Sequence, residues 1–193
     1  MEKKNRRKQA IDEHYEALAR EEIRTREDAG TITRSLGYSL EELAALPREA
    51  DLGLGCGNPH QMAKPREGEE VLDLGSGRGL DCFIAARAVG SSGRVVGVDA
   101  LASMVEKAQA LALKHGYTQC RFIQGEIEAI PCQSNSFDLV MSNCVINLSD
   151  DKEAVYNEIF RVLKPGGRVA VSDITAKQSL PAEWVADPHM AKT

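Results

Sequence analysis

The fold of this chain is decided by Val71-Leu72-Asp73-Leu74-Gly75-Ser76-Gly77-Arg78-Gly79. The apolar run at its start predicts a short buried strand, and the alternating glycines after it predict a tight turn. Leu80–Val89, directly after the turn, is predicted to be helical. A strand that enters a helix through glycines is typical of open α/β sheets, in which ligands bind at the carboxyl ends of the strands.

The alternation of strands and helices continues toward the C-terminus. Further strands are predicted at Arg94–Val98, Arg121–Ile123, Phe137–Met141 and Arg168–Ile174, and further helices at Ser103–His115 and Asp150–Lys164. Parallel strands need crossover connections, so this order predicts a Rossmann-like open, mostly parallel sheet with helices on both faces.

Capping residues are found at the predicted ends of these helices. Ser103 and Glu106 have the spacing of a capping box, and Gly116 can end the same helix in a left-handed conformation. Ser149 is the expected N-cap of the last helix. The segment that begins at Pro165 should end this helix before the fifth strand starts.

The N-terminal part divides into a charged helical segment over residues 1–30 and the beginning of a single domain over residues 31–193. Ile11, Tyr15 and Leu18 have helical spacing in the first segment, and Tyr15 lies on a helix that is a candidate lid.

Two short features follow in the early part of the domain. Tyr38–Leu46 is expected to form a short helix with Ser39 as its N-cap. The glycine-rich stretch Asp51–Pro59, which contains Cys56, is expected to form a loop.

Composition excludes several classes of protein. The chain has 193 residues, a formal net charge of -5 and 42% hydrophobic residues, so neither nucleic acid nor a membrane is an expected partner. The basic cluster near the N-terminus is interpreted as a solvated terminus. Five cysteines without CxxC spacing argue against a disulfide framework and a zinc knuckle, and favour free thiols in a cytoplasmic protein.

Three details of the glycine loop limit the class of ligand that it is expected to bind. Its spacing is GxGxG, whereas dinucleotide folds use GxGxxG, which disfavours an NAD-linked oxidoreductase. Asp73 precedes the loop by two residues, and Asp99 ends the second strand, where a carboxylate can accept hydrogen bonds from ribose hydroxyls. The alternative is a purely structural strand–turn–helix junction.

These motifs resemble those of class I S-adenosylmethionine methyltransferases. The resemblance implies S-adenosylmethionine as cofactor, held by Asp73, Gly75, Ser76, Gly77, Asp99, Met104, Glu126, Ile127 and Asn143. It further implies that Ile127 lies against the adenine ring and that Glu126 faces the exocyclic amine. Ordinary packing in a helix core is an equally good account of Met104.

Three strings narrow the resemblance to the arsenite methyltransferases. They are Leu52-Gly53-Leu54-Gly55-Cys56-Gly57-Asn58-Pro59, Gly125-Glu126-Ile127-Glu128-Ala129-Ile130-Pro131 and Ser142-Asn143-Cys144-Val145-Ile146-Asn147-Leu148. The resemblance, which runs from about Tyr38 to about Pro188, implies that Cys56 and Cys144 are the catalytic residues that bind trivalent arsenic.

The chemistry of arsenic agrees with that assignment. Trivalent arsenic is soft and thiophilic, so thiolates are its natural ligands. Two thiolates beside the cofactor would leave the arsenic lone pair free to attack the methyl carbon without a general base. The remaining cysteines, Cys82, Cys120 and Cys132, are interpreted as small buried hydrophobic residues.

The chain also departs from the family pattern. It stops at Thr193 without the third arsenic-binding cysteine and without the final pair of strands. Glutathione or another small thiol is a candidate third ligand, and the alternative is that arsenic is bound poorly or not at all. Arg168–Ile174 would then form an open sheet edge, so either a homodimer or partial order near the C-terminus is expected.

Two other functions remain open from the sequence. The first is methylation of a small organic molecule, such as a quinone or a sterol, with the cysteines incidental. The second is a truncated relative that binds cofactor or arsenic without turnover.

Overall fold

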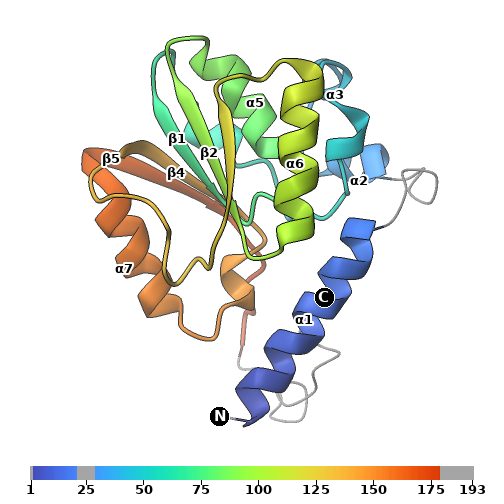
Figure 1. The fold of residues 1–193 in the computed structure, drawn as a ribbon, viewed down its shortest axis with the longest axis vertical. Helices are drawn as coiled ribbons and strands as arrows, with labels where there is room; N and C mark the ends of the chain where they lie inside the picture. Colours follow the sequence, from blue (N-terminus) through green and yellow to red (C-terminus); the bar gives the residue numbers. More distant parts are fainter. Residues whose placement is uncertain (1, 21–28, 179–193) are drawn as a thin grey trace.

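The computed structural model describes residues 2–20 and 29–178. Within these residues, five parallel strands form one sheet in the order β3-β2-β1-β4-β5 (Figure 1). The strands are β1 (Glu70–Leu74), β2 (Arg94–Asp99), β3 (Cys120–Gln124), β4 (Phe137–Asn143) and β5 (Leu163–Ser172). The predicted Rossmann-like sheet is confirmed.

The helices follow the predicted alternation. They are α1 (Glu2–Arg20), α2 (Ala29–Ser35), α3 (Leu40–Ala44), α4 (His60–Ala63), α5 (Leu80–Val89), α6 (Ala102–His115) and α7 (Lys152–Val162), with short 3-10 turns η2 (Arg48–Ala50) and η3 (Ile146–Leu148). No helix in the described part of the chain is long and apolar enough to cross a membrane.

The sheet is buried on both faces. Alternate residues of β1 point to opposite sides, so Val71 packs in the core beneath α5 and α6, whereas Leu72 packs in the core beneath α7. In Figure 1, α5 and α6 lie on one side of the sheet and α7 on the other. A parallel sheet covered in this way exposes its carboxyl edge for a ligand.

The expected C-cap of α6 is confirmed, since Gly116 is left-handed there with a φ of 76°. Two of the three expected N-caps are not found. The Ser39 capping box is present, with Glu42 as its acidic partner. The expected box at Ser103 is wrong, because Leu101 is the N-cap of α6 and the Ser103 hydroxyl donates to Glu16 of α1.

The expected cap of α7 is also wrong. Asp151, rather than Ser149, accepts a hydrogen bond from the Ala154 amide at 3.0 Å. The Ser149 side chain instead accepts from the Asp151 amide and donates to Glu128. In both cases the serine hydroxyl donates to a glutamate from another segment, and the helix begins at a different residue from the one that the sequence predicts.

The last helix and strand meet earlier than expected. The helix ends at Val162 rather than Lys164, and β5 already pairs at Leu163, opposite Phe137. The register shifts before Arg168 pairs with Leu139, so the glycine turn lies within β5. No strand follows β5 in the described residues, and the expected partial order near the C-terminus concerns residues outside them.

Helix α1 packs alongside α6 near the carboxyl ends of the strands (Figure 1). The buried guanidinium of Arg78, from the glycine loop, donates to the carbonyls of Leu18 and Ala19. A cation that binds the last carbonyls of a helix stabilises its C-terminus. The glycine loop and α1 are therefore held together directly.

Candidate functional site

The glycine loop folds tightly against the second strand. The amides of Gly75 and Ser76 both donate to the Val98 carbonyl, at 2.8 and 3.0 Å. Gly75 has a φ of 69°, and a Cβ added there would lie 2.6 Å from the Val145 side chain. Only glycine fits this position, because both the backbone conformation and the space exclude a side chain.

Asp99 fixes the far side of the loop. One of its carboxylate oxygens accepts from the Gly77 amide at 2.9 Å, and the other accepts from the Leu101 amide at 3.0 Å. Burial raises the pKa of Asp99, and the two amides oppose that shift. Each oxygen keeps a further lone pair for a ligand hydroxyl.

A single cavity brings most of the predicted cofactor residues together. It is lined by Gly75, Ser76, Gly77, Asp99, Met104, Glu126, Ile127 and Asn143, and also by Cys144. The cavity opens at the carboxyl edge of the sheet, where the ligands of such folds bind. Met104 and Ile127 are also buried, so their packing role and a ligand role are compatible.

Two of the predicted residues do not line this cavity. Asp73 is 2% exposed and lies beneath it, where the Cys82 thiol donates to its carboxyl group. Burial raises the pKa of Asp73 well above its usual range, and the charge of Asp81 adds to the shift. Cys56, a predicted arsenic ligand, is the second residue that does not line the cavity. It contacts Cys144, which does.

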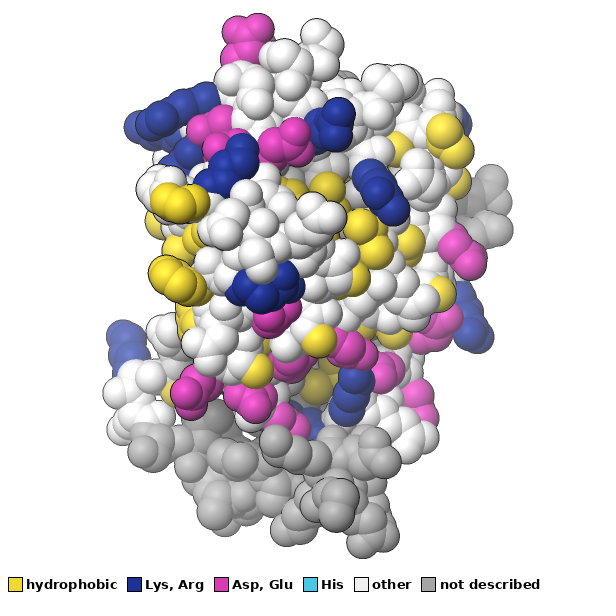
Figure 2. Space-filling view, turned by 60° about the vertical axis from the view of Figure 1, so that its left-hand side comes forward, with side chains coloured by type: hydrophobic (Ala, Val, Ile, Leu, Met, Phe, Trp, Pro, Cys, Tyr) yellow, Lys and Arg dark blue, Asp and Glu magenta, His cyan; other side chains and the backbone are white. Residues whose placement is uncertain are grey.

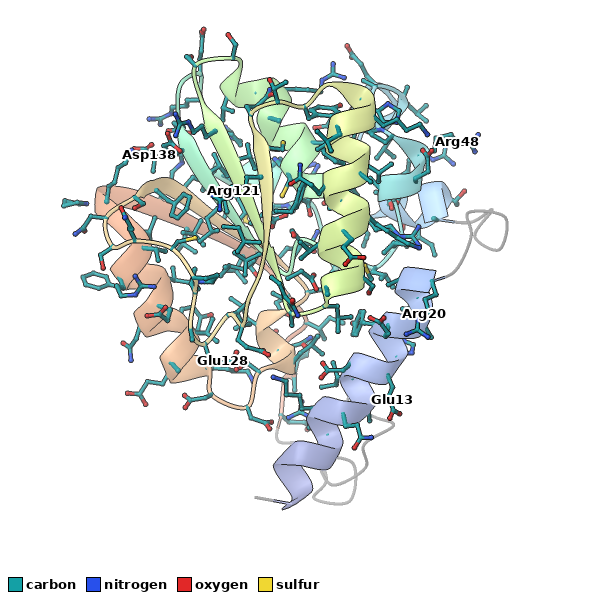
Figure 3. All side chains as sticks on the ribbon, viewed as in Figure 1. Glu13, Arg20, Arg48, Arg121, Glu128 and Asp138 are labelled. Carbon is teal, nitrogen blue, oxygen red and sulfur yellow. A yellow bond between two sulfur atoms is a disulfide. The ribbon has the colours of Figure 1, made fainter. Side chains whose placement is uncertain are left out.

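Helix α1 forms one wall of the cavity. Lys8, Ile11, Asp12 and Tyr15 line it, and the Lys8 ammonium donates to Glu126 at 2.6 Å. The helix that carries Tyr15, a candidate lid, therefore borders the same cavity as the glycine loop. Figure 3 shows that Glu13, on the same helix, projects away from the sheet.

Asn143 connects the end of β4 to the loop that carries Cys56. Its carboxamide oxygen accepts from the Cys56 amide at 2.9 Å. Its amide nitrogen lies 3.0 to 3.1 Å from the Tyr38 hydroxyl, the Gly57 carbonyl and Asp81, which share its two N–H groups. Both polar atoms of Asn143 are thus engaged by the protein, so it acts on neighbouring groups by positioning the loop.

Asp81 is the charged centre of this network. Burial alone would raise the pKa of Asp81, but hydrogen bonds from His60, Tyr38 and Asn143 lower it. The His60 ring nitrogen lies 3.1 Å from the carboxylate, and the Tyr38 hydroxyl donates at 2.6 Å. A buried carboxylate with this many donors is held ionised.

Cys56 and Cys144 form a disulfide across 88 residues of sequence, with their Cα atoms 5.5 Å apart. The expectation of a free thiol is therefore wrong for these two. Cys144 has a φ of 62°, and its amide donates to the Ser172 carbonyl at 2.8 Å. A left-handed conformation at a non-glycine residue costs energy and is typical of functional sites.

The interpretation of the other cysteines as packing residues agrees with their burial. Cys82 and Cys120 are buried and unpaired, and burial raises the pKa of Cys120 to about 12. Cys132 is half-buried, and burial also raises its pKa.

Asp173, just beyond β5, was missed in the sequence. One of its carboxylate oxygens and the two sulfurs of Cys56 and Cys144 all lie within 4.8 Å of one another. The predicted strand ran to Ile174, so Asp173 was placed inside it and not at the carboxyl edge of the sheet, where β5 in fact ends at Ser172. Tyr38, His60 and Asp81 were missed because their meeting depends on segments that are distant in sequence.

The charged side chains of the surface are mixed rather than separated. Figure 2 shows acidic and basic groups interspersed over one face, with acidic groups more frequent toward its lower part. A continuous basic stripe, which is the electrostatic signature of nucleic-acid binding, is not seen on this face among the described residues.

Comparisons with known proteins identify the relatives of this chain. A family model described as a methyltransferase domain matches residues 65–193. The arsenite methyltransferase of Halobacterium salinarum is 46% identical over 153 residues, which cover 79% of this chain and 39% of that protein. The demethylmenaquinone methyltransferase of Lactococcus lactis is 39% identical over 114 residues, 59% of this chain and 45% of that protein.

A solved structure supports the same relationship. CrArsM, an arsenic (III) S-adenosylmethionine methyltransferase from Chlamydomonas reinhardtii, has a TM-score of 0.64 and is 38% identical, covering 82% of this chain and 54% of that one. The chain spans about two fifths of the length of the arsenite methyltransferases that it matches.

Proposed function

Because the chain belongs to the methyltransferase domain family, we propose that it transfers a methyl group from S-adenosylmethionine to trivalent arsenic bound by Cys56 and Cys144. The observation that carries this proposal is the meeting of these two cysteines, 88 residues apart in sequence, beside the cavity behind the glycine loop. Arsenite and S-adenosylmethionine are also the substrates that the relatives' names give.

The glycine loop fits the amino-acid half of S-adenosylmethionine, which supplies a methyl group on a positively charged sulfur. Gly77 lines the cavity with a φ of 51°, and a Cβ added there would meet no atom within 4 Å. The backbone is therefore open to a ligand at this position. Asp73 beneath the cavity remains a predicted part of this half.

The other half of the cavity suits a nucleoside. The Asp99 carboxylate suits the ribose hydroxyls, since both of its oxygens are already oriented by backbone amides. Met104 and Ile127 supply apolar surface for a flat ring. Glu126, which pairs with Lys8 across the cavity wall, is the candidate partner for an exocyclic amine.

Arsenic requires the cysteine pair as two free thiols. The disulfide is then the oxidised form of the site, and a small thiol such as glutathione would serve as its reductant. Positioning by the two sulfurs would direct the arsenic lone pair toward the cavity, and no general base is needed for the attack. Cys56 and Cys144 are the catalytic residues of this proposal.

The sheet edge and the location of the protein are secondary proposals. β5 is an edge strand of the sheet within the described residues, which favours a homodimer formed along it. Free Cys82, Cys120 and Cys132 favour the cytoplasm. A thiol conjugate of arsenite, such as that with glutathione, is the alternative form in which the substrate reaches the two cysteines.

The test is an assay of methylated arsenic. The protein is incubated with arsenite, S-adenosylmethionine and glutathione, beside the variants Cys56→Ser, Cys144→Ser and, as a matched control, Cys132→Ser. We expect product from the wild type and from Cys132→Ser, and loss of at least 100-fold in either of the other variants. Product from all four proteins would exclude the thiolate mechanism, and transfer to a quinone instead of arsenite would favour the organic-substrate alternative.

A further inference from the structure

We propose that Asp173 lies beside the third position around the bound arsenic, where it accepts a hydrogen bond from the hydroxyl that arsenic retains. This inference rests on the proposed function, because it assumes arsenic on Cys56 and Cys144. It assigns a substrate contact to a residue outside the cysteine motifs.

The arrangement of three side chains carries the inference. A carboxylate oxygen of Asp173 and the sulfurs of Cys56 and Cys144 lie within 4.8 Å of one another, and all three residues are half-buried. Once the two sulfurs are reduced, such a trio is close enough to contact a single bound atom, with Asp173 on the side of β5.

The orientation of Asp173 is fixed by the backbone. One carboxylate oxygen accepts from the Asn147 amide at 3.0 Å, and the other accepts from the Ile174 amide at 2.8 Å. A carboxylate oxygen has two lone-pair sites, so each keeps one for a ligand. Asp173 is therefore preorganised as an acceptor, not as a donor.

The chemistry of arsenite supplies the matching donor. Binding to the cysteines is an exchange of ligands, As(OH)₃ + 2 RSH → (RS)₂As–OH + 2 H₂O, which needs no oxidant or reductant once both thiols are free. One hydroxyl remains on arsenic and has a proton to donate. Because the acceptor is charged, this hydrogen bond belongs to the stronger class.

The charge of Asp173 also suits the reaction. When the lone pair forms a bond to carbon, arsenic gains positive charge, and a carboxylate beside it stabilises that charge. A third thiol on arsenic would have to displace the hydroxyl that Asp173 binds. The inference therefore predicts that two cysteines and one carboxylate suffice for binding.

Two arsenicals separate this contact from the thiol contacts. Hydrated phenylarsine oxide, C₆H₅As(OH)₂, loses both hydroxyls to two thiols and keeps none. Binding of arsenite and of phenylarsine oxide is measured by calorimetry on the full chain, reduced with a phosphine, for the wild type, Asp173→Asn and Asp173→Ala. Glu13→Gln, which removes a negative charge from the exposed side of α1, is the matched control (Figure 3).

We expect Asp173→Asn to weaken arsenite binding about tenfold or more, as for loss of a hydrogen bond to a charged group. Its affinity for phenylarsine oxide should stay within about twofold of the wild type, because the remaining amide oxygen can still accept from Asn147. The Glu13→Gln control should bind both arsenicals as the wild type does.

Two results would overturn the inference while leaving the proposed function intact. One is equal weakening of both arsenicals by Asp173→Asn, which would mean that Asp173 only supports the loop. The other is unchanged arsenite affinity in both variants. Failure of the reduced wild type to bind phenylarsine oxide, or undiminished binding by Cys144→Ser, would instead overturn the proposed function together with this inference.

Discussion

The carboxamide oxygen of Asn143 accepts a hydrogen bond from the backbone amide of Cys56 at 2.9 Å, although 87 residues separate them. This bond attaches the loop that carries one thiol to the strand that precedes the other. A Cβ on Gly55 would lie 2.9 Å from the Asn143 side chain, so the loop passes directly over it. The distance between Cys56 and Cys144 thus depends on Asn143.

Replacement of Asn143 should therefore impair the thiol pair. Asn143→Ala removes the bond to Cys56 and the donor to Asp81, and we expect phenylarsine oxide to bind about tenfold more weakly. Loss of these buried partners should also lower the free energy of unfolding by about 2 kcal/mol. Calorimetry and urea unfolding measure the two effects, with exposed Gln133→Ala as the matched control. Arsenical affinity equal to the wild type would contradict the positioning role.

The first two glycines of the loop should respond differently to substitution by alanine. Gly75→Ala meets the Val145 side chain, so we expect about 3 kcal/mol of lost stability. Gly77→Ala meets no atom within 4 Å and should cost only about 1 kcal/mol for its left-handed backbone.

Besides stability, the affinity for S-adenosylmethionine distinguishes the Gly75→Ala and Gly77→Ala variants. Gly77 lines the cavity and a Cβ there meets no protein atom within 4 Å, so we expect the added methyl group to meet the ligand instead and to lower its affinity about tenfold, with the fold retained. Urea unfolding and calorimetry separate the two effects. Full affinity in Gly77→Ala would show that the ligand does not approach this glycine.

The strands and helices were predictable because burial dictates their pattern. β1 and β4 are buried on both faces, and each stands out in the sequence as a short apolar run. The cavity residues were implied by the resemblance to class I S-adenosylmethionine methyltransferases, and the order of parallel strands predicted only the edge at which they lie. Glycine spacing and Asp99 were sufficient to predict that edge.

Features that depend on tertiary partners were not predictable. Ser103 has a capping-box spacing, but α6 begins before it, at Ala102, and the Ser103 hydroxyl donates to Glu16 of α1. The odd number of cysteines concealed the disulfide, because Cys56 and Cys144 meet only when the loop crosses β4. Asp173 carries no local signal, since its significance comes from the two sulfurs beside it.

Asp99 should govern cofactor affinity. Asp99→Asn retains a carbonyl oxygen for the Gly77 amide but replaces the other acceptor with a donor, which faces the Leu101 amide. We expect S-adenosylmethionine to bind 10- to 100-fold more weakly, about the effect of losing a hydrogen bond to a charged group. Calorimetry with the cofactor measures it, and Glu13→Gln controls for net charge. An unchanged affinity would exclude Asp99 from the ribose site.

The five cysteines should differ in alkylation by iodoacetamide. The thiolate is the nucleophile, and with the pKa of Cys120 raised to about 12, about one thiol in 10,000 is ionised at pH 8. In the reduced native protein we expect Cys56 and Cys144 to react first, Cys132 more slowly, and Cys82 and Cys120 only after unfolding. Peptide mass spectrometry reads the order. Without prior reduction Cys56 and Cys144 should be protected, and their rapid labelling there would contradict the disulfide.

The buried carboxyl group of Asp73 should make stability depend on pH. Burial raises its pKa in the folded state, so the folded chain holds a proton that the unfolded chain releases above about pH 4. The unfolded state then binds fewer protons, and stability must fall as pH rises toward the folded pKa of Asp73. One retained proton corresponds to a slope of about 1.4 kcal/mol per pH unit.

Asp73→Asn removes this slope without adding a charge. The variant should be about as stable as the wild type near pH 4 and should exceed it increasingly as pH rises, because the wild type must keep a proton that asparagine does not need. Asp81→Asn is the contrasting variant, since hydrogen bonds from His60, Tyr38 and Asn143 lower the pKa of Asp81 and hold it ionised. It should destabilise the fold at neutral pH. Urea unfolding of the three proteins between pH 4.5 and 7.5 measures these differences, and a slope in Asp73→Asn equal to that of the wild type would mean that Asp73 is already ionised in the folded chain.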